Sequence, residues 1–386
     1  MLNSSLATRY SLLATKKSNN MSHIENSEEY KGLAVNQGVE QPPIVNPYIT
    51  RRVKRRQLSV NDYVEGILAG NRSILSQAVT LVESLLPEHH TIAQEVIEKC
   101  LPYAGKSIRL GITGVPGAGK STFIEALGTY LCKEQNHKLA VLAIDPSSER
   151  SKGSILGDKT RMEELSIAEN AFIRPSPSAG SLGGVARKTR ESIILCEAAG
   201  FDTIFVETVG VGQSETAMHS MVDFFLLIQL AGTGDELQGI KRGIMEMADG
   251  ITINKCDGNN IEKAQLAKRQ FQNALPLFPM PESGWAPQVT TCSAFEHINI
   301  PEVWKMVTDY VAFTNKNGYF DYRRNQQSKY WMYETIDEYL RTSFYNNPTI
   351  EALLKQYETM VNSNEMTSFA AAHKLLDTYN NIRNRE

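Results

Sequence analysis

The sequence predicts an α/β protein with a mostly parallel sheet flanked by helices, an N-terminal helical extension and a C-terminal helical arm. Three observations support this prediction. Between Ser107 and Val311, short apolar runs alternate with helical patterns, which is typical of a parallel sheet with crossover helices. Before this region, apolar residues recur at helical spacing. After about residue 318 the pattern is again helical and is rich in aromatic residues.

Length and composition restrict the class of protein. The 386 residues suggest two or three structural units, and the net charge of −3 provides no general attraction to nucleic acid or to an acidic membrane. No run of about 18 apolar residues occurs, so no transmembrane helix is predicted. The five scattered cysteines form no C-x-x-C pair, which argues against a disulfide framework or a structural zinc site and fits a reducing compartment.

Residues 1–58 are interpreted as a disordered, basic N-terminal arm. Residues 1–24 contain no acid and are rich in Ser, Thr and Asn, a composition that resembles a mitochondrial transit peptide. The alternative is a plain extension, with Met21 beginning the working chain, and we favour it because no Arg-rich amphipathic helix is evident. The expected location is therefore the cytoplasm, or the mitochondrial matrix if the segment is a transit peptide.

Residues 59–104 are predicted to form a small helical extension. Ser59 is suited to be the N-cap of its first helix, with Asp62 at the third helical position. A second helical pattern ends before Pro87, and a third continues to Cys100.

Residues 105–315 are predicted to form the sheet domain, and residues 316–386 a helical arm in which Pro348 separates two helical patterns. The arm contains no obvious catalytic or ligand-binding motif, and it is expected to pack on the core or on a second copy of the chain. The predicted strands are Ile108–Thr113, Leu139–Asp145, Thr203–Val206, Phe224–Leu230, Ile251–Asn254 and Val289–Cys292.

The segment after the first predicted strand matches the phosphate-loop pattern G-x-x-x-x-G-K-[ST] and opens the helical stretch Thr122–Cys132. Its glycines allow backbone N–H groups to turn toward phosphates, and the helix presents its positive end to them. Lys120 is expected to bind the β- and γ-phosphates, and the Ser121 hydroxyl to bind Mg²⁺. This indicates a P-loop NTPase whose phosphate-binding residues are Gly114, Val115, Pro116, Gly117, Ala118, Gly119, Lys120, Ser121 and Thr122.

The choice of base depends on Asn254-Lys255-Cys256-Asp257, an N-K-x-D motif directly after an apolar strand. Its Asp carboxylate can accept hydrogen bonds from guanine N1–H and the 2-amino group. Adenine has no matching pair of donors and would leave a buried carboxylate unsatisfied. The stem of Lys255 is expected to lie along the base, while Asn254 braces neighbouring loops.

A second base contact is predicted after the next strand, in Thr291-Cys292-Ser293-Ala294. A Ser-Ala pair at this place commonly binds the guanine oxygen through its backbone, so Ser293, Ala294 and the adjacent Phe295 are predicted to line the site. The three motifs together predict GTP and GDP as ligands and make the chain a GTPase.

Acidic residues follow or terminate several predicted strands, where open parallel sheets bind ligands. Mg²⁺ prefers hard oxygen ligands, and the candidates are Asp145, Asp158 and Glu207 together with Ser121. Glu207 begins Glu-Thr-Val-Gly, in the place of the D-x-x-G switch of GTPases. Gln213 follows shortly after and is predicted either to orient the attacking water or to be a plain polar switch residue.

With these motifs the chain resembles the GTPases that chaperone methylmalonyl-CoA mutase, a family formerly labelled arginine/ornithine transport kinases. The resemblance covers about residues 59–340, and Glu207 is that family's own residue at its position. The strings that carry the resemblance are Gly111–Thr122, Asp145–Ser148, Gly153–Met162, Glu207–Glu215, Gly234–Lys241 and Asn254–Asp257.

The resemblance implies a P-loop GTPase core with a C-terminal arm used in homodimerisation. It also implies that Asp145, Asp158 and Glu207 belong to the magnesium site. Asp235 and Lys241 match charged residues of a third switch loop that relays the nucleotide state to the mutase. With Lys120 and Gln213 they make up the expected catalytic set. GTP hydrolysis would then gate the loading of adenosylcobalamin into an acyl-CoA mutase and protect that cofactor.

Two other functions remain open at this stage. A metallochaperone GTPase would be expected to carry a His-rich tract or a Cys/His pair, and the seven histidines are dispersed. A small-molecule P-loop kinase would prefer ATP, which Asp257 disfavours. Neither a nucleic acid nor a membrane is a predicted partner.

Overall fold

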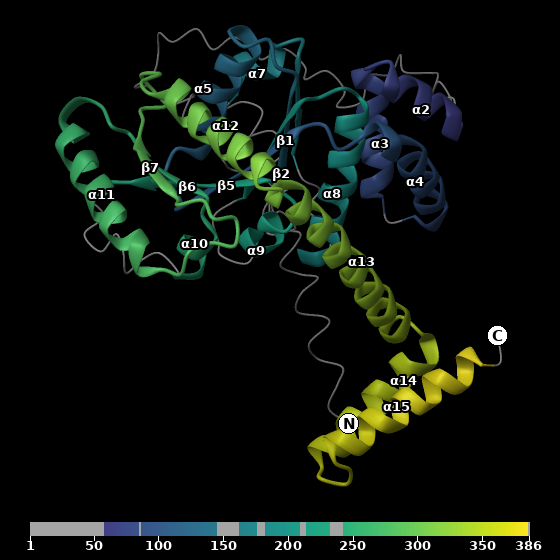
Figure 1. Ribbon diagram of the computed structural model, residues 1–386. Helices are drawn as coiled ribbons and strands as arrows, with labels where there is room; N and C mark the ends of the chain where they lie inside the picture. The colour runs from purple at the N-terminus through teal and green to yellow at the C-terminus, as the bar shows by residue number, and fades with distance from the viewer. Residues whose placement is uncertain are drawn as a thin grey trace, which may run out of the picture. The chain divides into compact units, whose positions relative to one another are not determined.

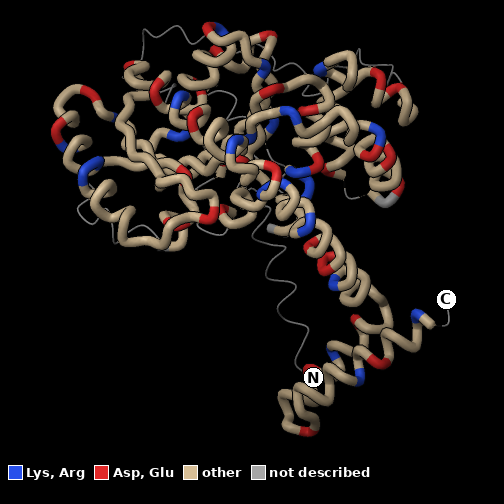
Figure 2. The backbone as a smooth tube through the Cα atoms, in the orientation of Figure 1, with Lys and Arg blue, Asp and Glu red and all other residues tan. Residues whose placement is uncertain are grey.

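The computed structural model describes residues 58–84, 86–144, 162–175, 182–208, 214–231 and 242–384. All of these residues belong to one compact unit, Leu58–Glu386. None of the helices described is long and apolar enough to cross a membrane. Basic and acidic residues are interspersed over the described helices (Figure 2).

A parallel sheet forms the centre of this unit (Figure 1). It has seven strands, all parallel, in the order β3-β2-β4-β1-β5-β6-β7. The predicted α/β class is therefore confirmed, and each of the six predicted strands is present within one or two residues. The strands are β1 Ile108–Gly114, β2 Leu139–Ile144, β3 Ala171–Arg174, β4 Thr203–Thr208, β5 Phe224–Leu230, β6 Gly250–Asn254 and β7 Gln288–Thr291.

Strand β3 has no counterpart among the strands predicted from the sequence. This strand has four residues, lies at one edge of the sheet and pairs only with β2, so its apolar run is too short to stand out. The five inner strands, β1, β2, β4, β5 and β6, are buried on both faces, as expected for parallel strands with helices on each side.

Two hydrophobic cores lie on the two faces of the sheet. One contains residues of α5 and α12, and the other contains residues of α8, α9 and α11 together with the N-terminal helices. The helices around the sheet are α5 Lys120–Lys133, α7 Glu163–Ile167, α8 Leu182–Ala198, α9 Ser214–His219, α10 Arg242–Met247, α11 Ile261–Ala274 and α12 Ile300–Lys316, with 3₁₀ turns at η3 Leu101–Tyr103, η5 Gly258–Asn260 and η6 Leu275–Leu277.

The N-terminal extension consists of α2 Val60–Leu68, α3 Arg72–Glu83 and α4 Pro87–Cys100, all of which contact α8. Its first helix begins with a capping box. The Ser59 hydroxyl accepts from the Asp62 N–H at 3.2 Å, and the Asp62 carboxylate accepts from the Ser59 N–H at 2.8 Å. Two of the N–H groups at the helix start are thereby satisfied.

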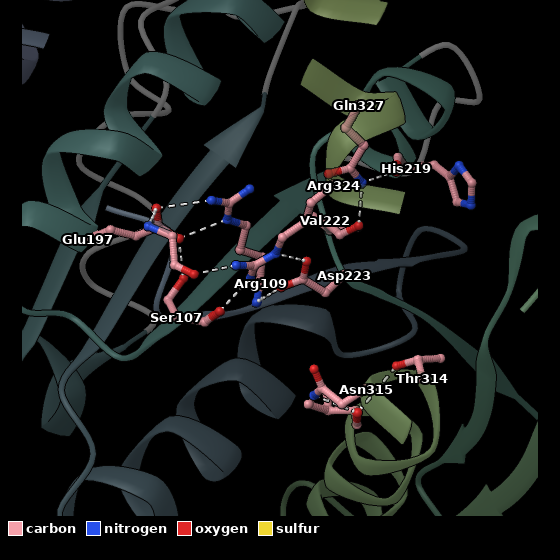
Figure 3. A network of polar contacts seen from close by, with 12 residues as sticks. Ser107, Arg109, Glu197, His219, Val222, Asp223, Thr314, Asn315, Arg324 and Gln327 are labelled. Atoms are coloured by element: carbon pink, nitrogen blue, oxygen red, sulfur yellow. Dashed lines mark hydrogen bonds and ion pairs between the residues drawn. The ribbon is translucent and has the colours of Figure 1, made fainter. Parts of the chain in front are cut away.

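Helix α13, Tyr319–Tyr345, is joined to the amino ends of the strands by buried ion pairs (Figure 3). The Arg324 guanidinium donates to both carboxylate oxygens of Asp223, at 2.8 and 2.6 Å, and to the Ser107 carbonyl at 2.6 Å. Beside it, Arg109 donates to both oxygens of Glu197, at 2.8 and 3.0 Å. This network links α13, α8 and the starts of β1 and β5.

Two helices follow α13: α14 Pro348–Asn362 and α15 Ser368–Arg383. Asn347 caps α14 by accepting from the N–H of Thr349 at 3.0 Å, and Pro348 occupies the first turn, where its missing N–H costs nothing. The two helices share a small core of their own, formed by Ile350, Leu375 and Tyr379.

Candidate functional site

The phosphate loop connects the central strand β1 to α5. Its glycines serve the geometry in two ways. Gly117 and Gly119 have φ values of +81° and +83°, in the left-handed region that favours glycine. Gly114 lies so close to β5 that a Cβ there would be 2.2 Å from the Ile228 carbonyl oxygen. Only glycine, which has no Cβ, allows the loop to adopt this backbone conformation and to pass so close to β5.

Lys120 begins α5 and turns back over the loop. Its ammonium group donates to the carbonyl oxygens of Gly114 at 3.0 Å and Val115 at 3.4 Å. Burial lowers the pKa of Lys120, while the charges of Glu207 and Glu215 oppose that shift. The ammonium group therefore lies in a partly buried, acidic environment at the mouth of the loop, where phosphate oxygens could replace the carbonyls as its partners.

Two of the predicted metal ligands come together in the structure. The Ser121 hydroxyl donates to a Glu207 carboxylate oxygen at 3.4 Å, because β4 pairs with β1 and places Glu207 beside Ile112. A hydroxyl and a carboxylate are the hard oxygen donors that suit Mg²⁺, which usually takes few protein ligands. Within the described ranges no group of three or more His, Cys, Asp or Glu side chains is placed so that it could hold a metal ion.

Five predicted site residues lie outside the residues that the structure describes. They are Asp145, Asp158, Gln213, Asp235 and Lys241.

Asn254, at the end of β6, joins the two halves of the site. Its amide nitrogen donates to the Ala118 carbonyl in the phosphate loop at 2.8 Å, and its amide oxygen accepts from the Ala294 N–H at 3.0 Å. Asn254 is buried. A Cβ on Gly119 would lie 2.8 Å from the Asn254 amide nitrogen, so the glycine makes this close approach possible.

Asp257 lies beside the loop after β7. Its carboxylate accepts from the Ser293 hydroxyl at 2.5 Å, and that hydroxyl in turn accepts from the Glu296 N–H at 3.1 Å. Ser293 also forms two backbone hydrogen bonds with Ile298, each 3.0 Å long, which close the loop. An ionised carboxylate has about four acceptor sites, so Asp257 can still accept hydrogen bonds from a ligand's N–H groups.

Lys255 and Phe295 flank this region. Lys255 has a φ of +59°, and its Cε lies 3.9 Å from where a Cβ on Gly119 would be, so its stem runs toward the phosphate loop. The Phe295 side chain is 78% exposed and lies on the surface next to Ala294.

Sequence reasoning gave no role to Glu215, which the structure buries behind the phosphate loop. Its carboxylate accepts a hydrogen bond from Thr113, whose hydroxyl in turn accepts one from Thr208. The only feature of the sequence that pointed to a contact here was Thr113, a threonine at the end of an apolar strand and directly before the phosphate loop. Burial of an acid 102 residues later could not be predicted from it.

The chain is similar to known proteins over most of its length. The family model described as methylmalonyl Co-A mutase-associated GTPase MeaB matches residues 75–349. A solved structure titled LAO/AO transport system kinase superimposes with a TM-score of 0.67 at 37% sequence identity, covering 83% of this chain and 97% of that one.

Curated relatives match a similar share of the chain. A probable GTPase of Mycobacterium tuberculosis is 46% identical over 83% of this chain and 96% of its own length. The GTPase ArgK of Escherichia coli is 44% identical, over 81% and 94% respectively. A mouse protein named methylmalonic aciduria type A homolog, mitochondrial, is 43% identical, over 84% of this chain and 80% of its own length.

Proposed function

The chain belongs to the family of methylmalonyl-CoA mutase-associated GTPases, and from this premise we propose that it is a GTP-hydrolysing chaperone of an adenosylcobalamin-dependent acyl-CoA mutase. Its enzymatic activity is that of a GTPase. The proposed partner is methylmalonyl-CoA mutase, and the proposed task is to gate the loading of the cofactor and to protect it.

The observation that carries the nucleotide part of the proposal is the double hydrogen bond of Asn254. This side chain fixes the phosphate loop, through Ala118, relative to the loop of Ala294. Phosphates and base would thereby be bound at a set distance from each other. Asp257 would recognise guanine, because an ionised carboxylate can only accept hydrogen bonds and guanine offers two adjacent donors.

The phosphate side of the site would act through charge. The N–H groups of residues 114–122 and the Lys120 ammonium would bind the β- and γ-phosphates, which the helix start of α5 favours. Ser121 and Glu207 would hold Mg²⁺, with Asp145 and Asp158 as further ligands. When bound there, the metal would neutralise charge that develops on the phosphate oxygens.

Three further residues complete the proposed machinery. Gln213 would orient the attacking water, and Asp235 with Lys241 would relay the nucleotide state to the mutase. Slow basal hydrolysis that the partner accelerates is expected, because a switch need not be preorganised when it is alone.

We also propose a homodimer formed through the C-terminal arm. Large apolar side chains are exposed along this arm, and a groove of about 580 Å³ between α13, α14 and α15 is lined by Phe344, Leu354 and Tyr357 among others. An exposed apolar surface of this kind is typical of an interaction site. The exposed residues are Tyr322, Tyr330, Met332, Tyr333, Ile336, Tyr339, Leu340, Tyr345, Phe369 and Leu376.

Steady-state GTP turnover tests the proposal. The purified chain is assayed alone and with methylmalonyl-CoA mutase from the same source, and Lys120→Ala provides the background rate. We expect turnover that the mutase increases and that the variant abolishes. Turnover without stimulation would reject this partner while leaving the GTPase intact, and isobutyryl-CoA mutase would then be assayed next.

A further inference from the structure

A buried carboxylate lies behind the phosphate loop. Glu215, in the first turn of α9, is 1% exposed. One of its oxygens accepts a long hydrogen bond, 3.4 Å, from the Thr113 hydroxyl. Among the described residues its other oxygen has no hydrogen-bond partner. Such an arrangement is costly, because removing a carboxylate from water without full hydrogen bonding is unfavourable.

Thr113 connects this carboxylate to a second element. Its hydroxyl oxygen also accepts from the Thr208 hydroxyl at 2.9 Å. Thr208 is the last residue of β4, directly after the proposed metal ligand Glu207, while Thr113 immediately precedes Gly114 of the phosphate loop. A continuous series of side chains, Thr208–Thr113–Glu215, therefore runs from β4 across β1 to α9.

Backbone packing brings α9 against β1 at the same place. Gly111 lies two residues before Thr113, and a Cβ there would be 2.9 Å from Val222 and 3.2 Å from Met218. The missing side chain allows α9 and the residues after it to approach the strand closely. Thr113 is thus the side chain nearest to the phosphate loop in the contact between this helix and the central strand.

We propose that Glu215 is a positioning residue for GTP hydrolysis, which acts through Thr113 and Thr208 to hold the start of α9 and the end of β4 in register with the phosphate loop. It touches neither nucleotide nor metal. The inference rests on the GTPase activity and on the proposed nucleotide site, and it is independent of any mutase partner.

The costly burial of Glu215 supports a functional role. If the carboxylate served only the fold, a neutral side chain of the same shape would be at least as stable there, because the amide is easier to remove from water. Proteins retain destabilising groups of this kind where activity depends on them. Glu215→Gln should therefore lower the rate of GTP hydrolysis without lowering the stability of the fold.

The test compares variants of the full chain by kcat and KM for GTP, by GDP affinity and by thermal unfolding. For Glu215→Gln and for Thr113→Val we expect kcat to fall about tenfold to a hundredfold, the range that a small misplacement of reacting groups produces. KM and GDP affinity should change by no more than about threefold, because the ground-state contacts to the nucleotide are kept. The double variant should lose no more than the worse single variant, since Glu215→Gln weakens and Thr113→Val removes the same hydrogen bond.

Two controls distinguish positioning from general damage. Thr113→Ser keeps the hydroxyl and should therefore keep most of the rate that Thr113→Val loses. Thr203→Val removes a buried hydroxyl at the opposite end of β4 and should leave kcat as it is.

Several results would overturn the inference. The first is a kcat for folded Glu215→Gln within about twofold of that of the unaltered chain. The second is a double variant in which the two losses of kcat multiply. The third is a Thr113→Ser variant that is as slow as Thr113→Val. If Glu215→Gln does not fold, the carboxylate is structural and the positioning role is rejected. In each case Lys120→Ala still reports separately on the nucleotide site.

Discussion

One amide group, that of Asn254, connects the phosphate loop to the loop after β7. The hydroxyl of Ser293 extends this connection to Asp257, so that the carboxylate is held before any ligand arrives. Preorganisation of this kind is what allows a buried acceptor to discriminate between bases, because a mismatched base leaves it unsatisfied.

This hydrogen-bond pattern predicts the effect of Asp257→Asn. The new amide would present donors where guanine also has donors, so GTP affinity should fall about a hundredfold. Xanthine has a carbonyl in place of the 2-amino group, and xanthosine triphosphate should therefore gain affinity in the same variant. Competition binding with the two nucleotides measures both changes. A variant that still prefers GTP would reject the role assigned to Asp257, and Asp309→Asn, at an exposed residue of α12, is the matched control.

At the scale of elements, α13 is attached to the sheet by charge rather than by apolar packing alone. Arg324 satisfies both oxygens of Asp223, a side chain only 2% exposed, and its guanidinium also lies 4.4 Å from the ring centre of Phe320. The same carboxylate accepts from the Arg109 N–H at 2.8 Å, so strand and helix share one acceptor.

Removal of Arg324 would leave Asp223 buried without its cation. We expect Arg324→Ala to lower the free energy of unfolding by about 2–4 kcal/mol, since breaking one partner of a buried pair is strongly destabilising. Lys305→Ala breaks an exposed pair with Asp309 on α12 and should cost about 0.5 kcal/mol or less. Urea unfolding of the two variants measures both changes in the free energy of unfolding. Equal changes would show that the buried pair adds no more stability than the exposed one.

At the scale of the whole molecule, the proposed dimer follows from the distribution of apolar surface. Tyr339 and Phe369, on the C-terminal arm, are 69% and 80% exposed. Leu277, in the turn η6 between α11 and β7, is exposed to the same degree as Phe369, 81%, but lies outside the arm.

The double variant Tyr339→Glu/Phe369→Glu should therefore sediment as a monomer while it still binds GTP. Leu277→Glu carries a comparable change in hydrophobicity and should keep the mass of the unaltered chain. Sedimentation equilibrium over a range of concentrations measures both. If all three proteins have the same mass, the arm is not the dimer interface.

The sequence by itself determined the parts of this protein whose chemistry is local. The phosphate loop and the N-K-x-D motif are contiguous, and each requires particular residue types at fixed spacing, so Lys120, Ser121 and Asp257 could be selected without a structure. The strands could be predicted for a similar reason, since burial on both faces produces short, continuous apolar runs. Of the strands that the structure describes, only β3 was missed, because four residues at an edge carry too little pattern.

Tertiary structure alone decided which distant side chains meet. Asn254 and Ala118 are 136 residues apart, Thr113 and Glu215 are 102 apart, and Arg324 and Asp223 are 101 apart. No periodicity or spacing encodes such pairs. Whether an acid such as Glu215 is solvated or buried depends on what the folded chain packs around it, and burial is what changes the energy of a charge.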